Sequence, residues 1–274
     1  MCAARKTRQP PDLLKKQDPK PWEMINPRGK GQGLIVCDHA AKRLPVALKK
    51  DFGVCPADLK RHIGWDIGAA DVSRHIAKKL DMPGVLGAYS RLVVDLNRAP
   101  KHPQFIPAVS DNTPVPGNEN LTAAQRKARE AAIFKPYHGA VSDRIDGFLD
   151  EGRVPLLLFI HSYTPEMDGE KRPWHVGIMW NREKAIAKKL MAGFKAVKPG
   201  IVVGDNKPYS LQNEYFADCT PFRHAEDRGL PYVFIEFRQD LVDTPLKATR
   251  WGNMFIKALQ PVLDDPKTFR LRKI

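Results

Sequence analysis

Long apolar runs are missing from this 274-residue sequence, and their absence argues against a membrane-spanning protein. No stretch approaches the roughly 18–20 consecutive apolar residues that a transmembrane helix needs. The opening segment, MCAARKTRQPPDLLKK, also lacks the apolar stretch that forms the core of a secretory signal. We therefore expect a soluble protein located in the cytoplasm.

Cysteine is scarce, and its spacing excludes the usual cysteine frameworks. The four cysteines are Cys2, Cys37, Cys55 and Cys219, and no two of them form a C-x-x-C pair. Neither a zinc ribbon nor a redox-active dithiol fits this spacing. Reduced, unpaired thiols are the expectation for an enzyme of the cytosol.

Acidic residues are outnumbered by basic ones, 31 against 45, which gives a net charge of +14. Such an excess raises the question of a nucleic acid or a small anionic substrate. The sequence carries no nucleic-acid-binding motif and no run in which aromatic residues alternate with arginine. We expect a solvated basic surface and a small anionic substrate. Nucleic-acid binding stays an alternative that rests on net charge alone.

The content of hydrophobic residues, 42%, and of charged residues, 28%, is typical of a globular protein. Residues 1–30 contain five prolines and are predicted to be an irregular arm, and residues 31–274 a single domain. Residues 99–120 form a long loop of the kind that often acts as a functional lid. Apolar strands alternate with amphipathic helices, which predicts an α/β sheet covered by helices on both faces. The predicted strands are 34–37, 85–95, 154–160, 176–180, 201–203 and 232–237, and the predicted helices are 67–80, 121–150, 183–195 and 245–264.

Several predicted strands end in side chains that can bind a metal or move a proton. His39 follows the first strand, Asn97 and Arg98 follow the second, and His161 follows the buried central one. Glu236 lies near the end of a later strand. In open α/β sheets, ligands bind beyond the carboxyl ends of the strands. A histidine at a strand end is also often structural, but several reactive ends together favour a functional site.

A catalytic zinc ion takes three protein ligands and keeps one position open. His39 and His161 are the natural nitrogen ligands, and Asp66, just before a predicted helix, is our candidate for the third. Asp66 has an alternative role as the N-cap of that helix. His62 is a competing ligand or an outer hydrogen-bonding group. Asp38 either orients His39 or simply ends the strand.

Glu236 is the candidate general base. It stands between Ile235 and Phe237, and a carboxylate flanked by apolar residues is partly desolvated. Desolvation raises the pKa of a carboxyl group toward the range that suits proton transfer. The alternative is a structural salt bridge between Glu236 and Arg238.

Arg91, Asn97 and Arg98 are candidates for binding a substrate carboxylate. Arginine binds carboxylates through two parallel hydrogen bonds, and a neighbouring asparagine can add a directed one. Arg91 and Arg98 would face opposite sides of one extended strand, so a bend near Asp95 and Leu96 is needed for both to reach one ligand. The alternative is that they are ordinary surface arginines.

Five segments of the chain have a familiar combined order: CDHAAKRLP, HIGWDIGAADVSRHIA, YSRLVVDLNR, FIHSYTP and PYVFIEFRQDLV. Together they resemble the N-formylglutamate amidohydrolase family, over about residues 32–243. The resemblance implies a three-layer αβα fold with a mixed, mostly parallel central sheet, like that of the zinc exopeptidases of the phosphorylase/hydrolase type. It also implies zinc-dependent hydrolysis of N-formyl-L-glutamate to formate and glutamate.

The wider relation to zinc carboxypeptidase-like enzymes and aspartoacylases implies roles for single residues. Their order of a histidine ligand, an arginine, an Asn-Arg pair, a second histidine ligand and a catalytic glutamate is similar to the order found here. By this resemblance Arg91, Asn97 and Arg98 hold the substrate carboxylate, and one of them polarises the carbonyl group. The matching residues are His39, Arg91, Asn97, Arg98, His161 and Glu236.

The sequence departs from that pattern at the first ligand motif. Zinc exopeptidases have His-x-x-Glu, whereas His39 is followed by Ala40, Ala41 and Lys42. The second ligand must therefore come from elsewhere, and Asp66 is our candidate. Three alternatives stay open: hydrolysis of another N-acyl amino acid, hydrolysis of a peptidoglycan-type amide, and carboxylate binding without catalysis or metal.

Overall fold

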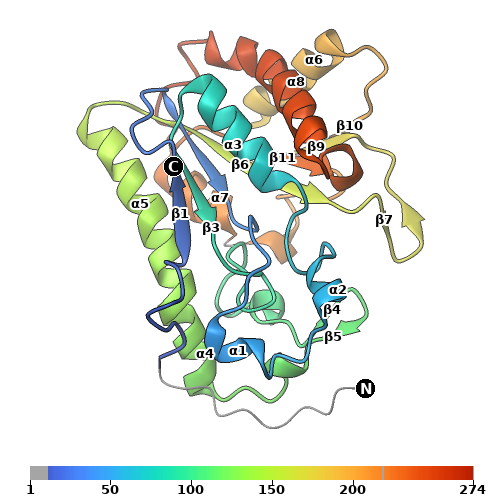
Figure 1. The fold of residues 1–274 in the computed structure, drawn as a ribbon. Coiled ribbons are helices and arrows are strands. Elements are labelled where there is room, and N and C mark those ends of the chain that lie inside the picture. Colours follow the sequence, from blue (N-terminus) through green and yellow to red (C-terminus); the bar gives the residue numbers. More distant parts are fainter. Residues whose placement is uncertain (1–11, 218, 274) are drawn as a thin grey trace.

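The longest apolar run of the sequence forms the centre of a seven-stranded sheet (Figure 1). The structure is a computed structural model that describes residues 12–217 and 219–273. All eight residues of strand β6 (Leu156–Tyr163) are buried, as expected for a strand covered on both faces. In sheet order the strands are β1 (Trp22–Ile25), β3 (Gly84–Gly87), β2 (Gly33–Cys37), β6, β11 (Tyr232–Arg238), β9 (Val176–Met179) and β10 (Val203–Asp205).

The sheet is mixed but mostly parallel. Strands β3, β2, β6 and β11 run parallel to one another, and β10 runs parallel to β9. Strand β1 is antiparallel to β3, and β9 is antiparallel to β11. The carboxyl ends of the four central strands therefore meet at one edge, where a ligand site is expected.

Successive side chains of the central strands enter two separate hydrophobic cores. In β6, Leu156, Leu158 and Ile160 belong to one core, and Leu157 and Phe159 belong to the other. This alternation is the period-two geometry of a strand. It divides the molecule into a helical layer on each side of the sheet.

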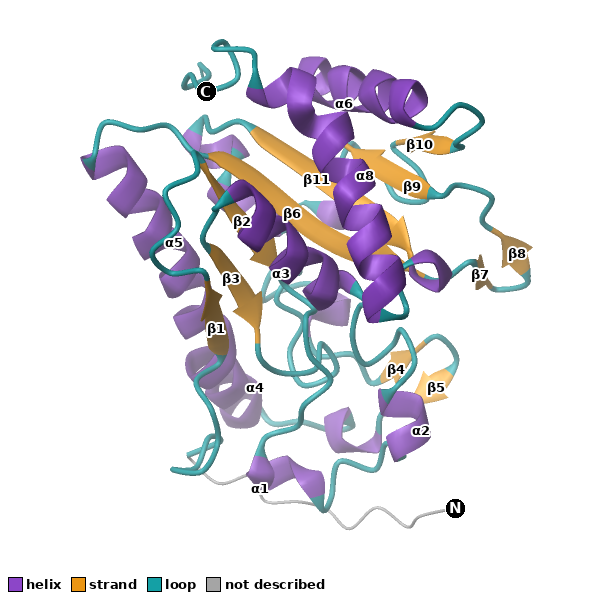
Figure 2. Ribbon diagram, turned by 45° about the horizontal axis from the view of Figure 1, so that its top comes forward, coloured by secondary structure: helices purple, strands orange, loops and turns teal. Residues whose placement is uncertain are grey.

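Three long helices cover one face of the sheet, and one long helix covers the other (Figure 2). Helices α3 (Ala69–Leu80), α6 (Lys184–Val197) and α8 (Pro245–Leu263) pack on the first face. Helix α5 (Lys135–Asp150) packs on the opposite face, against β1, β2 and β3. The predicted three-layer α/β fold is confirmed.

Shorter elements connect these layers. Helix α4 (Ala123–Arg129) continues through a π-helical turn over Glu130–Phe134 into α5, so the predicted helix over 121–150 is one nearly continuous rod. Pro136 lies where the π-helical turn passes into α5. The shorter α-helices are α1 (Val46–Lys49), α2 (Pro56–Leu59) and α7 (Thr220–His224), and two small hairpins are formed by β4 (Val109–Ser110) with β5 (Thr113–Pro114) and by β7 (Glu166–Met167) with β8 (Glu170–Lys171). Short 3-10 helices lie at Pro103–Phe105, Pro116–Asn118, Glu214–Phe216, Glu226–Arg228 and Gln239–Leu241.

The predicted strand over residues 85–95 is wrong beyond Gly87. After β3 the chain turns: Ser90 donates a backbone hydrogen bond to Arg43, and Asp95 donates one to Phe105. The apolar residues that suggested a longer strand are buried in this compact turn. A short apolar run gives the same pattern whether a strand or a buried turn contains it.

The predicted arm over residues 1–30 lies partly outside the described residues. In its described part, residues 22–25 form β1 and pair with β3 at the edge of the sheet, so this part is not irregular. Pro19, Pro21 and Pro27 surround this strand, and their density favoured the prediction of an irregular segment. No helix within residues 12–217 and 219–273 has both the length and the apolar character needed to cross a membrane.

Candidate active site

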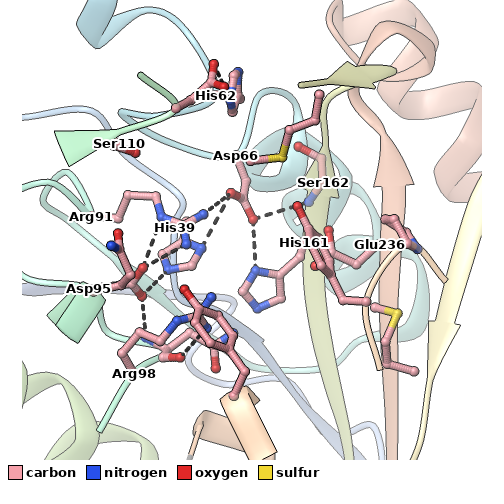
Figure 3. Close-up of a pocket in the computed structure, with 18 of the residues that line it drawn as sticks. His39, His62, Asp66, Arg91, Asp95, Arg98, Ser110, His161, Ser162 and Glu236 are labelled. Atoms are coloured by element: carbon pink, nitrogen blue, oxygen red, sulfur yellow. Dashed lines mark hydrogen bonds and ion pairs between the residues drawn. The ribbon is translucent and has the colours of Figure 1, made fainter. Parts of the chain in front are cut away.

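A cavity of about 670 Å³ opens where β2, β6 and β11 reach the edge of the sheet (Figure 3). His39 follows β2, His161 lies near the end of β6, and Glu236 lies near the end of β11. Asp66, from the loop before α3, lines the same cavity. The ends of separate strands therefore converge on one pocket.

His39, Asp66 and His161 could together hold a metal ion, because one ligand atom from each lies within 4.8 Å of the others; these three residues are the candidate metal-binding group. All three are buried. Asp66 bridges the two imidazoles: its Oδ2 lies 2.8 Å from Nδ1 of His161, and its Oδ1 lies 3.4 Å from Nδ1 of His39. The two rings are 5.1 Å apart between centroids, at 73° to each other.

The backbone holds Asp66 between its partners. The N–H of Asp66 donates to the carbonyl of His39 over 2.9 Å, and the N–H of Ser162 donates to the Asp66 carboxylate over 3.2 Å. The alternative role of Asp66 as a helix N-cap is not observed, because Gly68 is the N-cap residue of α3. Asp66 therefore joins the loop before α3 to β6.

Each histidine is also held from behind by a second carboxylate. Nε2 of His39 lies 2.7 Å from Oδ1 of Asp95, and Nε2 of His161 lies 3.1 Å from Oδ2 of Asp38. Asp38 in turn accepts a 2.8 Å hydrogen bond from the hydroxyl of Tyr137 on α5. Both imidazoles therefore have their Nε2 engaged and direct Nδ1 toward Asp66. One interpretation of the sequence was that Asp38 orients His39. The structure shows that Asp38 contacts His161 instead.

These contacts shift the acid–base equilibria of the group. Burial lowers the pKa of His161, but its hydrogen bonds to Asp38 and Asp66 outweigh burial and raise that pKa to about 10. Burial opposes ionisation of Asp66, but the two imidazoles outweigh it and hold the pKa of its carboxyl well below the usual range. Opposite charges in a desolvated cluster stabilise one another in this way.

Glu236 faces the cavity beside His161, its direct neighbour across the β11–β6 ladder. Its side chain is 6% exposed, and its Oε2 has no hydrogen-bond partner. Burial raises the pKa of Glu236 to about 7, with repulsion from Asp66 adding to the effect and His161 opposing it. The alternative salt bridge to Arg238 is not observed, because Arg238 pairs with Asp240.

Arg91, Asn97 and Arg98 also line the cavity, but from a loop and not from a strand end. Arg91 forms ion pairs with two carboxylates: its Nη2 lies 2.7 Å from Asp95 and its Nη1 lies 3.4 Å from Asp66. Oδ1 of Asn97 accepts the backbone N–H of Thr220. The guanidinium of Arg98 stacks on the ring of Tyr215, 5.3 Å from its centroid.

The chemistry of the buried group fits a divalent metal ion. Nδ1 of His39 is buried and lacks a hydrogen-bond partner, although Asp66 lies close by. A buried polar atom without a partner is costly, and a metal would satisfy it. Metal-binding histidines in proteins almost always give their other ring nitrogen to a carboxylate or carbonyl, as both do here.

All seven residues predicted for the site line one cavity. His62 also lines the cavity, but its Nε2 lies 3.3 Å from Asp111, and it is outside the metal-binding group. The sequence reasoning missed Asp95, although it lies inside the DLNR segment. It also missed Arg172, which stands in a polar hairpin without any pattern that could single it out.

Comparison with known proteins identifies the family. Residues 32–242 match the family model for N-formylglutamate amidohydrolase. The crystal structure of gene product Atu2144 from Agrobacterium tumefaciens is 31% identical, with a TM-score of 0.84 over 91% of this chain and 99% of that one. The N-formylglutamate amidohydrolase from Ralstonia eutropha JMP134 is 16% identical, with a TM-score of 0.65 over 88% and 96% of the two chains, a likeness of fold alone.

No sequence among the curated proteins matches this chain. The family match covers most of the chain and confirms the resemblance drawn from the five segments. The chain therefore belongs to the N-formylglutamate amidohydrolase family, hydrolases that act on amide bonds.

Proposed function

We propose that this protein is a zinc-dependent amidohydrolase that cleaves N-formyl-L-glutamate to formate and glutamate. The observation that carries this proposal is the convergence of His39, Asp66 and His161 beside the buried carboxyl of Glu236 in one cavity. The three residues would supply two nitrogen ligands and one oxygen ligand, the donor set of many catalytic zinc sites. When bound, the ion supplies a Lewis acid that polarises a carbonyl and lowers the pKa of water to about 7.

Glu236 is the proposed general base. A carboxyl with a pKa of about 7 is partly ionised near neutral pH and can both accept and return a proton. It takes a proton from the water that attacks the formyl carbon. It then delivers that proton to the nitrogen as the C–N bond breaks, which leaves formate and the free amine of glutamate.

The arginines have separate proposed tasks. Asp95 and Asp66 hold Arg91 close to the metal-binding group, which suits it to stabilise the oxyanion that forms on the carbonyl oxygen. Asn97 and Arg98 are proposed to bind the α-carboxylate. Since Oδ1 of Asn97 accepts from Thr220, the other hydrogen-bonding group of that side chain is its Nδ2 donor, which matches a carboxylate.

The decisive variant is Glu236→Gln, which keeps the shape of the side chain and removes the base. We expect kcat for release of formate to fall by at least about 10²-fold, because general base catalysis contributes that much or more. Elemental analysis should still find one zinc ion per chain. The matched control is Glu119→Gln, at an exposed position away from the cavity, which should leave both values unchanged. Undiminished activity in Glu236→Gln, or active protein without metal, would contradict the proposal.

A further inference from the structure

Arg172 is a cation of the cavity wall that the reaction proposed above does not use. It follows β8 directly and lines the same cavity as Glu236 and Arg91. Its backbone is fixed at the base of the β7–β8 hairpin, because its N–H donates to the carbonyl of Pro165 over 2.8 Å. The guanidinium of Arg238 approaches its carbonyl oxygen to 3.5 Å. The hairpin base therefore holds Arg172 at a defined place.

The neighbours of this guanidinium are neutral. Nη1 donates to the hydroxyl of Tyr209 over 3.1 Å, and Nη2 approaches the sulfur of Met167 to 3.0 Å. The rings of Tyr209 and Tyr163 lie 5.1 and 5.9 Å from its Cζ. A phenol, a thioether and two aromatic faces orient the charge, and none of them neutralises it.

The contrast with Arg91 shows what Arg172 lacks. Arg91 has two carboxylates, Asp95 and Asp66, within 3.4 Å. Within residues 12–217 and 219–273, no carboxylate oxygen lies within the 4.0 Å of an ion pair from the guanidinium nitrogens of Arg172. A half-buried guanidinium with five N–H donors matches a carboxylate in charge and in geometry. Its preferred counterion is therefore a group that enters the cavity from outside.

Tyr209 connects this cation to the catalytic part of the cavity. Its hydroxyl accepts the hydrogen bond of Arg172, and burial raises its pKa, with the charge of Glu236 adding to the effect. Arg91 acts on the same phenol in the opposite direction. Arg172 and Tyr209 therefore line the same cavity as the catalytic groups, and not a remote surface.

We propose that Arg172 determines specificity by binding a second carboxylate of the substrate, the one at the end of an acidic side chain. This inference rests on the proposed function: Asn97 and Arg98 hold the α-carboxylate, and Arg172 selects a dicarboxylic N-acyl amino acid over a neutral one. The site would discriminate glutamate from glutamine by charge, since a guanidinium that is desolvated on binding gains more from a carboxylate than from an amide.

The kinetic test compares Arg172→Gln with the matched control Lys171→Gln, which removes the same charge from the exposed neighbouring residue. For Arg172→Gln we expect kcat/KM for N-formyl-L-glutamate to fall about 10- to 100-fold, mainly through KM, because one charged hydrogen-bonded contact is lost. The kcat/KM for N-formyl-L-glutamine should stay within twofold. Lys171→Gln should behave as the wild type with both substrates. Equal losses on both substrates would assign Arg172 a structural role and overturn the proposal.

A binding measurement keeps this inference separate from the proposed reaction. Glutarate is a plain dicarboxylate that needs no amide bond, and its affinity for the zinc-loaded protein can be measured by calorimetry. We expect its Kd to rise about 10- to 100-fold in Arg172→Gln and to be partly restored in Arg172→Lys, whether or not formate is released from any substrate. If the wild type binds no glutarate, or if Arg172→Gln binds it equally well, Arg172 is not an anion site.

Discussion

Two carboxylates behind the metal-binding group decide how its histidines are oriented. Asp95 engages Nε2 of His39, and Asp38 engages Nε2 of His161. Each contact fixes the rotation of an imidazole ring and makes its Nδ1 a better electron donor toward a metal. Tyr137 on α5 donates a hydrogen bond from its hydroxyl to Asp38, the carboxylate that contacts His161.

Asp38→Asn should therefore weaken metal binding without removing a ligand. We expect the dissociation constant of zinc to rise about 10- to 100-fold, as is usual when an outer partner of a ligating histidine is lost. Competition with a chromophoric chelator measures it. The control Asp143→Asn makes the same chemical change at an exposed position of α5 and should leave the affinity unchanged. A zinc affinity in Asp38→Asn equal to that of the control would show that Asp38 does not act through His161.

At the level of residues, the sequence predicted the types of side chain better than their partners. His39, His161 and Glu236 stand out because they end apolar strands, and Asp66 follows from the need for a carboxylate. Asp95 could not be assigned to His39, because the two lie 56 positions apart and are brought together only by the turn after β3. A partner across such a distance leaves no local pattern.

Helices α5 and α7 meet through a buried pair of histidines. His138 on α5 and His224 on α7 lie 2.8 Å apart, from Nδ1 to Nε2, and His138 also contacts the carbonyl of Leu96 over 2.9 Å. Burial lowers the pKa of His138 to about 4. Burial, together with His138, lowers the pKa of His224 to about 3. Both rings are therefore neutral in the folded protein near neutral pH.

This pair should make the fold sensitive to acid. The folded pKa values lie below the value of about 6.5 expected in the unfolded chain, so the unfolded state binds more protons between pH 6.5 and about 4. Stability therefore falls as pH falls, by up to about 1.4 kcal/mol per pH unit for each histidine. In His224→Gln, urea unfolding should show a smaller loss of stability between pH 6.5 and 4.5 than in the wild type. Equal slopes in the two proteins would contradict the assignment.

Elements whose apolar residues are buried with a regular spacing were predicted well, and the compact turn after β3 was not. Helices α3, α6 and α8 and strands β6, β9 and β11 lie close to their predicted ranges, because burial on defined faces sets their apolar spacing. The turn after β3 was misjudged because its apolar residues are buried without the strand geometry. This wrong strand prediction also affects the site, because Arg91, Asn97 and Arg98 come from that turn.

For the whole molecule, the sequence predicted the layers but not the order of the strands. Alternation of strands and helices is enough to indicate helices on both faces of a sheet. Contacts between distant segments decide that β1 pairs with β3 at the edge of the sheet and that β9 is antiparallel to β11. The site needed only the four central parallel strands, which is why its cavity was expected at the correct edge.

The metal-binding group joins segments that the chain separates widely, so a bound metal should stabilise the entire fold. His39 ends β2, Asp66 precedes α3, and His161 lies in β6 at the centre of the sheet. A ligand that binds only the folded state at 100 times its Kd adds about 2.7 kcal/mol to the free energy of unfolding. For a chain of this size that corresponds to a rise in Tm of about 5–10 °C.

Scanning calorimetry of chelator-treated protein, with and without added zinc, measures this rise. His161→Gln is the matched control, because it removes one ligand while keeping a polar side chain of similar size, and zinc should raise its Tm by far less. A rise of the same size in the variant would locate the stabilising metal elsewhere. No rise in the wild type would mean that the three side chains meet for a structural reason, with Asp66 serving only to neutralise two protonated imidazoles.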